Sequence, residues 1–137
     1  ELKRHRMMTQ SAQPLTTDLG YATPKWMVAS GFQAQYDAAM QAAKAAYDTL
    51  AKIDPAAASY VVPNGFNRRV LLTTNLRPAN HLLALRSAPN AHFSIRRVAQ
   101  RMYEQIKEIY PVFGEWLRIE ESEDWQTIEA THFDSMY

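Results

Sequence analysis

The sequence predicts an α+β fold that is dominated by helices and contains a small sheet. Two long segments, residues 32–50 and 95–109, carry apolar side chains at steps of three and four, a spacing typical of amphipathic helices. Between them, residues 70–74 are apolar or β-branched, which favours a strand. The chain has 137 residues, 47% of them hydrophobic, and is long enough to bury the core of one domain.

The first half of the chain is predicted to be mainly helical. Residues 1–23 have no sustained period. Thr23 is expected to cap a short helix that starts at Pro24 and ends near residue 30. The elements expected next are a long helix to about residue 52, ended by Asp54-Pro55, one further turn at residues 56–58, an extended segment at 60–62 and a turn at 63–65.

The second half is predicted to begin with the strand, over residues 66–74. Asn75 follows the strand and is expected to cap a helix over residues 76–86, because its side-chain oxygen can accept from a free backbone N–H group at a helix start. Three leucines of this helix should point toward the core; they are Leu82, Leu83 and Leu85.

A last long helix is expected over residues 91–110, where Pro111 stops it. Beyond it the composition becomes acidic. The acidic stretch at residues 120–129 is expected to be only partly ordered.

The charge of the chain is unevenly divided. The net charge is +1, but residues 1–114 carry a balance of +7 and residues 115–137 a balance of −6. A basic body suits anionic partners such as nucleotides, dinucleotide cofactors, polyglutamylated folates or nucleic acid. Nucleic acid is the weakest of these, because no basic stripe with interleaved aromatic residues is present.

Cysteine is absent from the chain, which excludes disulfides, thiolate metal sites and thiol nucleophiles. No stretch approaches the roughly 20 apolar residues of a membrane span. The basic start runs into Met7 and Met8 rather than an apolar signal segment, so a cytoplasmic protein is expected. The chain begins at Glu1 without an initiator methionine, as a piece of a longer protein would.

Arg4-His5-Arg6 is the first candidate site. Two guanidinium groups and an imidazole within three residues can clamp a pyrophosphate or flank the electron-rich face of a redox ring. The alternative is a solvated basic patch near the start of the chain.

The second candidate site follows the predicted strand. Asn75, Arg77, His81 and Arg86 begin at a helix N-terminus, where the helix dipole and free N–H groups favour an anion. Arginine adds a rigid donor fork, and asparagine adds both a donor and an acceptor. The alternative is an ordinary helix cap followed by surface arginines.

The third candidate is His92, at the start of the last long helix. A lone histidine there is more often a cap or an exposed side chain than a catalyst. No metal site is expected, since the four histidines are not closely paired and the first three have no acid at i+3 or i+4. Glycine-rich phosphate loops are absent as well.

Taken in order, these clusters resemble the flavin-dependent thymidylate synthase (ThyX) family. The family motif is Arg-His-Arg, seven residues and a serine; here Arg4-His5-Arg6 is followed by seven residues and Pro14. The family also has a strand, an N-x-R turn and a helix with a later L-R pair, which is similar to Asn75-Leu76-Arg77 and Leu85-Arg86. The resemblance covers roughly residues 4–114, although family members carry a further N-terminal portion.

The resemblance implies an enzyme that converts dUMP, or a related pyrimidine nucleotide, to dTMP. Members are homotetramers that bind FAD at subunit interfaces, reduce it with NADPH and take a methylene group from methylenetetrahydrofolate. It implies a synthase-like domain over residues 1–117 and an acidic tail over residues 118–137.

The resemblance also implies residue roles. Arg86 falls where the family places an arginine against the pyrimidine, as a catalytic and substrate-binding group, and His92 falls at a second substrate position. The positions that match the flavin-binding residues are Arg4, His5, Arg6, Asn75, Arg77 and His81.

Several positions depart from the family pattern. The residues that replace nucleotide-binding Glu, Ser and Arg groups are Ala12, Pro14, Thr16 and Ser59. Arg68, Arg69 and Arg96 are candidates to compensate. These losses keep open a second interpretation, a non-catalytic partner domain of a larger or duplicated assembly.

Overall fold

The computed structural model of the chain describes residues 2–136 and divides them into two compact units. The first contains the N-terminal residues to Gln10 together with Leu72–Thr131, and the second contains Ser11–Leu71 and the C-terminal residues from His132. Both units are mainly helical, and the strands are short. The α+β, helix-dominated fold class is therefore confirmed. Within the described residues, no helix is long and apolar enough to cross a membrane.

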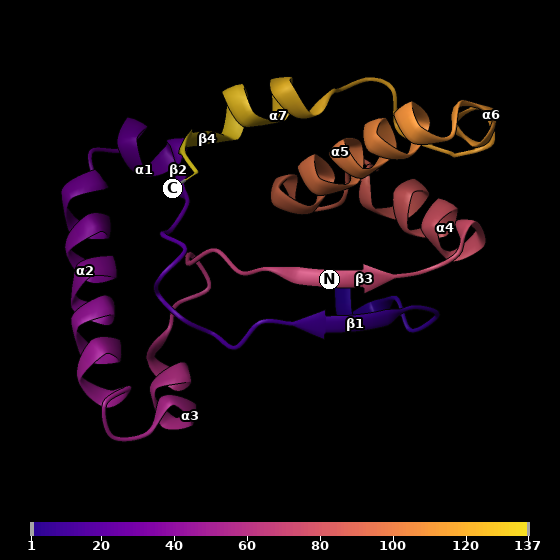
Figure 1. The fold of residues 1–137 in the computed structure, drawn as a ribbon. Coiled ribbons are helices and arrows are strands. Elements are labelled where there is room, and N and C mark those ends of the chain that lie inside the picture. The colour runs from indigo at the N-terminus through magenta and orange to yellow at the C-terminus, as the bar shows by residue number, and fades with distance from the viewer. Residues whose placement is uncertain (1, 137) are drawn as a thin grey trace. The chain divides into compact units, whose positions relative to one another are not determined.

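Two long helices build the first unit. Helix α4, Leu76–Arg86, packs beside α5, Phe93–Ile109, and the short α6, Pro111–Gly114, continues from the end of α5 (Figure 1). The buried centre of their interface consists of Leu82, Leu83, Ala99 and Leu117. The 3-10 turn η1, Leu2–Arg4, contributes Leu2 to this core, and α7, Trp125–His132, follows later in the chain.

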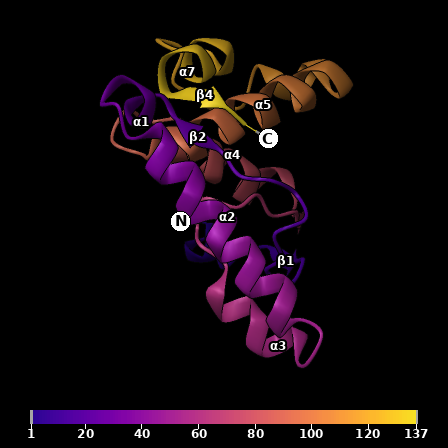
Figure 2. The ribbon, with the colours of Figure 1, turned by 90° about the vertical axis from the view of Figure 1, so that its left-hand side faces the viewer.

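The second unit is built around one long helix. Helix α2, Gln33–Leu50, lies beside α3, Pro55–Ala58 (Figure 2). Its core is formed by Met40, Val62 and Phe66 with a ring of tyrosines around them. The remaining elements of this unit are β2 (Thr23–Pro24), α1 (Lys25–Ala29), the 3-10 turn η2 (Ser59–Val61) and β4 (Phe133–Ser135), which pairs antiparallel with β2.

A second two-stranded sheet joins β1, Thr9–Ala12, to β3, Val70–Thr73. The arrows of the two strands point in opposite directions in Figure 1. Because β1 follows the Arg-His-Arg turn and β3 leads directly into α4, this sheet fixes the end of the first segment that carries candidate site residues and the start of the second.

Most of the long elements agree with the predictions from sequence. Helix α4 has the predicted bounds, and α2 and α5 agree within a few residues. Asn75 caps α4 as predicted: its Oδ1 accepts from the Arg77 backbone N–H at 3.2 Å. Gly31, at φ +76°, supplies the left-handed residue between α1 and α2, a conformation that glycine adopts at little cost.

Several short elements correct the predictions. Thr23 does not cap a helix, because it pairs with β4 and the helix begins after Pro24. The described residues form four short strands, whereas the sequence pointed to one strand at residues 66–74, of which Val70–Thr73 is a strand. Residues 60–62 are not fully extended, since Ser59–Val61 forms a 3-10 turn. The acidic segment is more ordered than expected, because α7 begins at Trp125.

The prediction that Leu85 points toward the core is also wrong. Leu82 and Leu83 are fully buried, whereas Leu85 is 45% exposed. Ala79, Leu82, Leu83 and Arg86 follow the i, i+3, i+4, i+7 pattern of the buried face of a helix, and Leu85 lies off that face. Arg86 takes the fourth position instead and is half-buried.

Candidate functional site

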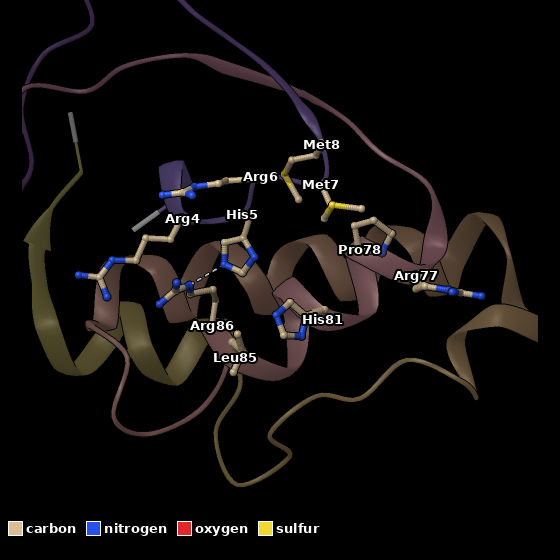
Figure 3. A pocket seen from close by; sticks show the side chains of 10 residues that line it. All are labelled: Arg4, His5, Arg6, Met7, Met8, Arg77, Pro78, His81, Leu85 and Arg86. Carbon is tan, nitrogen blue, oxygen red and sulfur yellow. Dashed lines mark hydrogen bonds between the residues drawn. The ribbon is translucent and has the colours of Figure 1, made fainter.

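An arginine-lined pocket of about 620 Å³ lies within the first unit (Figure 3). The N-terminal segment and helix α4 line it together, through Arg4, His5, Arg6, Met7, Met8, Arg77, Pro78, His81, Leu85 and Arg86. These residues include four arginines, two histidines and no acid, so the pocket favours an anionic ligand. Its volume is in the usual range for small-molecule sites.

The Arg-His-Arg turn is held in place by backbone contacts. The His5 backbone N–H donates to the Leu2 carbonyl at 3.0 Å. The Gln10 side-chain amide donates to the carbonyls of Leu2 and His5, at 2.8 and 3.1 Å. This turn buries the His5 ring, which is 7% exposed, and leaves Arg4 and Arg6 exposed. Two exposed cations thus flank one buried imidazole.

The His5 ring is bonded to Arg86. The guanidinium Nε–H of Arg86 donates to Nε2 of His5 at 2.8 Å (Figure 3). An arginine can only donate, so Nε2 of His5 carries no proton and the ring proton lies on Nδ1. The His81 ring lies edge-on to His5, with the ring centroids 5.9 Å apart. The N-terminal motif and the end of α4 therefore form one cluster.

The start of α4 offers fewer backbone donors than the sequence alone implied. Asn75 uses its Oδ1 to accept from the Arg77 N–H, and Pro78 has no N–H. Fewer backbone donors are therefore left for an anion at this helix start, where Arg77 adds a guanidinium donor, and the anion-binding role stays a prediction. Arg77 is exposed and lies at the far end of the pocket from Arg4 in Figure 3.

Replacing Asn75 separates its two possible roles. Asn75→Ala is expected to lower the free energy of unfolding by about 1 kcal/mol, the usual effect of losing a helix cap. Asn75→Asp should keep the cap, because the carboxylate oxygen also accepts from Arg77 and suits the helix dipole. Urea denaturation of the two variants measures this difference. An equal decrease in the free energy of unfolding of both variants would contradict the capping role.

His92 is not among the residues that line this pocket. Its Nδ1 accepts from the Ser94 backbone N–H at 3.3 Å and lies 2.7 Å from the Ser94 hydroxyl, so it caps α5. Its ring stacks at a tilt on Phe93, with centroids 4.1 Å apart. The geometry favours the capping interpretation, and the substrate-binding role stays a prediction.

The proposed compensating arginines are partly engaged elsewhere. The Arg68 Nε donates to the Gln13 carbonyl at 2.5 Å. Arg96 forms an ion pair with Glu123 at 3.1 Å, with only 14% of its side chain exposed. Arg69 is exposed. The four departures from the family pattern all lie in the second unit, whereas the arginine-lined pocket lies in the first.

The apolar wall of the pocket was not predicted from the sequence. Met7, Met8, Pro78 and Leu85 form this wall, and none of them carries a chemical signature. The helical pattern described above could have placed Leu85 off the buried face. Nothing in the sequence could have placed Met7 or Met8. Among the described residues, no group of three metal-ligating side chains occurs.

Residues 1–112 match the family model described as thymidylate synthase complementing protein. The chain belongs to this family. It is a divergent member of the ThyX type, which confirms the resemblance seen in the sequence.

The relatives differ in how much of their length the chain covers. A UPF0159 protein of Chlamydia muridarum is 37% identical over 118 residues, which are 86% of this chain and 22% of that protein. A UPF0159 protein of Thermoplasma acidophilum is 32% identical over 91% of this chain and 26% of its own length. A flavin-dependent thymidylate synthase of Geobacter sulfurreducens is 28% identical over 81% of this chain and 52% of its length. The chain thus spans about a quarter of the UPF0159 relatives.

A solved structure has the same fold. The flavin-dependent thymidylate synthase ThyX of Helicobacter pylori, crystallised with FAD and dUMP, superposes with a TM-score of 0.63 over 88% of this chain and 66% of that one. The sequences are 17% identical, so this likeness concerns the fold.

Proposed function

We propose that this chain is a flavin-binding domain of a thymidylate-synthase type enzyme, which methylates dUMP or a related pyrimidine nucleotide to dTMP. The observation that carries the proposal is the pocket in which the Arg-His-Arg turn meets Arg77, His81 and Arg86 of α4. Membership of the family supports it. So does the Helicobacter pylori neighbour, which was solved in complex with FAD and dUMP.

The pocket residues fit FAD by their chemistry. FAD carries an anionic diphosphate and a flat, largely apolar ring. Arg77 would bind the diphosphate, since guanidinium groups form paired hydrogen bonds to phosphate oxygens, and Arg4 and Arg6 would contribute positive charge to the binding of the same anionic cofactor. The apolar wall and the two imidazoles would contact the ring. Asn75 would act by fixing the start of α4.

Arg86 would contact the pyrimidine. A fixed guanidinium there stabilises negative charge on the ring as C5 becomes nucleophilic. The flavin, reduced by NADPH, would supply the hydride that converts the methylene group from methylenetetrahydrofolate into the methyl group. The homotetrameric state and the cytoplasmic location stay predictions that accompany this function.

FAD binding is the direct test of the proposal. Addition of FAD at about 100 times its dissociation constant should raise the free energy of unfolding by about 2.7 kcal/mol, measured as a thermal shift. Arg77→Gln should weaken FAD binding about tenfold or more, the usual effect of losing a charge-assisted hydrogen bond. Arg101→Gln is the matched control, because Arg101 is exposed and does not line the pocket. Colourless protein with no shift at micromolar FAD would contradict the proposal.

A second function is a non-catalytic partner domain that completes a larger assembly. It is favoured by the residues at nucleotide-binding positions of the family, which are Ala12, Pro14, Thr16 and Ser59. Each lost phosphate bond weakens binding by roughly 1.5–3 kcal/mol. Formation of dTMP by this chain alone, in the presence of dUMP, methylenetetrahydrofolate, FAD and NADPH, would exclude this alternative. FAD binding without turnover would support it.

A further inference from the structure

A second cavity of about 520 Å³ lies beside the arginine-lined pocket in the same unit. We call it the tryptophan groove; its lining residues are Leu76, Arg77, Asn80, Val112, Phe113, Trp116 and Leu117. Trp116 is 77% exposed and Val112 is 71% exposed. Large apolar side chains gathered in one groove at such exposure indicate a binding surface.

The walls of the groove are fixed from behind. Leu117 belongs to the buried core of the unit. Asn80 of α4 accepts from the Arg118 backbone N–H through its Oδ1 at 2.7 Å, which ties the segment after α6 to α4. The Phe113 ring is edge-on to Tyr110, with centroids 6.0 Å apart. The indole of Trp116 is therefore presented by a held backbone.

Arg77 lines both cavities. Its guanidinium can bind a diphosphate at the junction, with one part of a ligand in each cavity. The tryptophan groove has no acidic lining residue, so it does not oppose an anion at Arg77. It offers aromatic faces, which stack on planar rings and are tolerant of ring identity.

We propose that the tryptophan groove binds the adenine ring of an adenine nucleotide, stacked on Trp116, while Arg77 binds the adjoining diphosphate. In the case of FAD the inference rests on the proposed function, and it places the two halves of the cofactor on opposite sides of Arg77. A ligand without the adenosine half, such as FMN, leaves the groove empty.

The test compares three ligands on three proteins. ADP, FAD and FMN are titrated into the wild-type chain, Trp116→Ala and Trp26→Ala, with dissociation constants from calorimetry. Trp26 is the matched control, because it is 76% exposed and lies in the other unit. Trp116→Ala should weaken ADP and FAD about tenfold or more, as expected for the loss of one stacked base. FMN should be unaffected, and Trp26→Ala should change none of the three.

Fluorescence gives an independent readout. ADP should quench the part of the tryptophan emission that Trp116→Ala removes. Trp116→Phe keeps an aromatic face and should restore most of the ADP affinity. Thermal unfolding should be similar for all variants, since both substituted indoles are exposed.

Three outcomes would overturn the inference. ADP fails to bind the wild-type chain; Trp116→Ala leaves the ADP and FAD affinities unchanged; or Trp116→Ala abolishes self-association but not ADP binding, which makes the groove a protein contact. If FMN binds in the first two cases, the flavin function stands and only the groove assignment fails. If ADP binding depends on Trp116 but neither FAD nor FMN binds, the groove is supported and the flavin function is contradicted.

Discussion

Replacement of His5 by leucine is expected to weaken dUMP binding at least tenfold and to lower the free energy of unfolding by about 1–3 kcal/mol. His5 is buried, and its Nε2 accepts from the Arg86 Nε–H at 2.8 Å. Leucine fills much of the same space but cannot accept a hydrogen bond, so the half-buried Arg86 loses this partner. Isothermal titration with dUMP measures the affinity, and urea denaturation measures the stability.

His5→Gln and His81→Leu are the controls. The glutamine amide oxygen can accept near the position of Nε2 and should restore much of the dUMP affinity. His81 is exposed and has no hydrogen bond to Arg86 among those described, so His81→Leu should have a smaller effect on stability. An equal loss of dUMP affinity in His5→Leu and His5→Gln would show that the hydrogen-bond acceptor at position 5 does not determine dUMP binding.

Leu82→Ala is expected to destabilise the first unit by about 2–5 kcal/mol, the range for removing a fully buried leucine. Leu82 is 0% exposed and lies in the interface of α4 with α5. A loss of this size is a large part of the 5–15 kcal/mol that stabilises a typical domain. The unfolding midpoint in urea should fall accordingly, as measured by circular dichroism.

Leu85→Ala is the matched control, because it makes the same change on the same helix three residues later. Leu85 is 45% exposed, so its truncation should lower the free energy of unfolding by well under half as much. Leu85 lines the arginine-lined pocket, and its loss should instead weaken flavin binding. Similar destabilisation by both variants would mean that Leu85, like Leu82, lies on the buried face of α4.

The candidate site shows how far residue chemistry leads without coordinates. The sequence identified six of the ten pocket residues, because arginine and histidine are recognisable as anion-binding groups from their residue type alone. It also identified two residues that the structure uses as caps, Asn75 and His92. A cap and a ligand-binding group have the same local signature, a polar side chain at a helix start. Only their neighbours in space distinguish them.

The sequence by itself determined the three long helices, α2, α4 and α5. The bounds of α4 follow from Asn75 at its start and from its apolar spacing, and α2 and α5 follow from periodicity. These features depend on residues three or four positions apart along the chain. Local spacing is enough to specify them.

Only the tertiary structure decided which distant groups meet. The short strand β1 has a polar sequence and exists because it pairs with β3, about sixty residues away. In the same way Arg86 meets His5 across 81 positions, and Arg77 lies between two cavities. Contacts of this kind arise from packing of the whole unit around Leu82 and Leu83. No local pattern encodes them, because the energy that forms them is gained only when the entire core is buried.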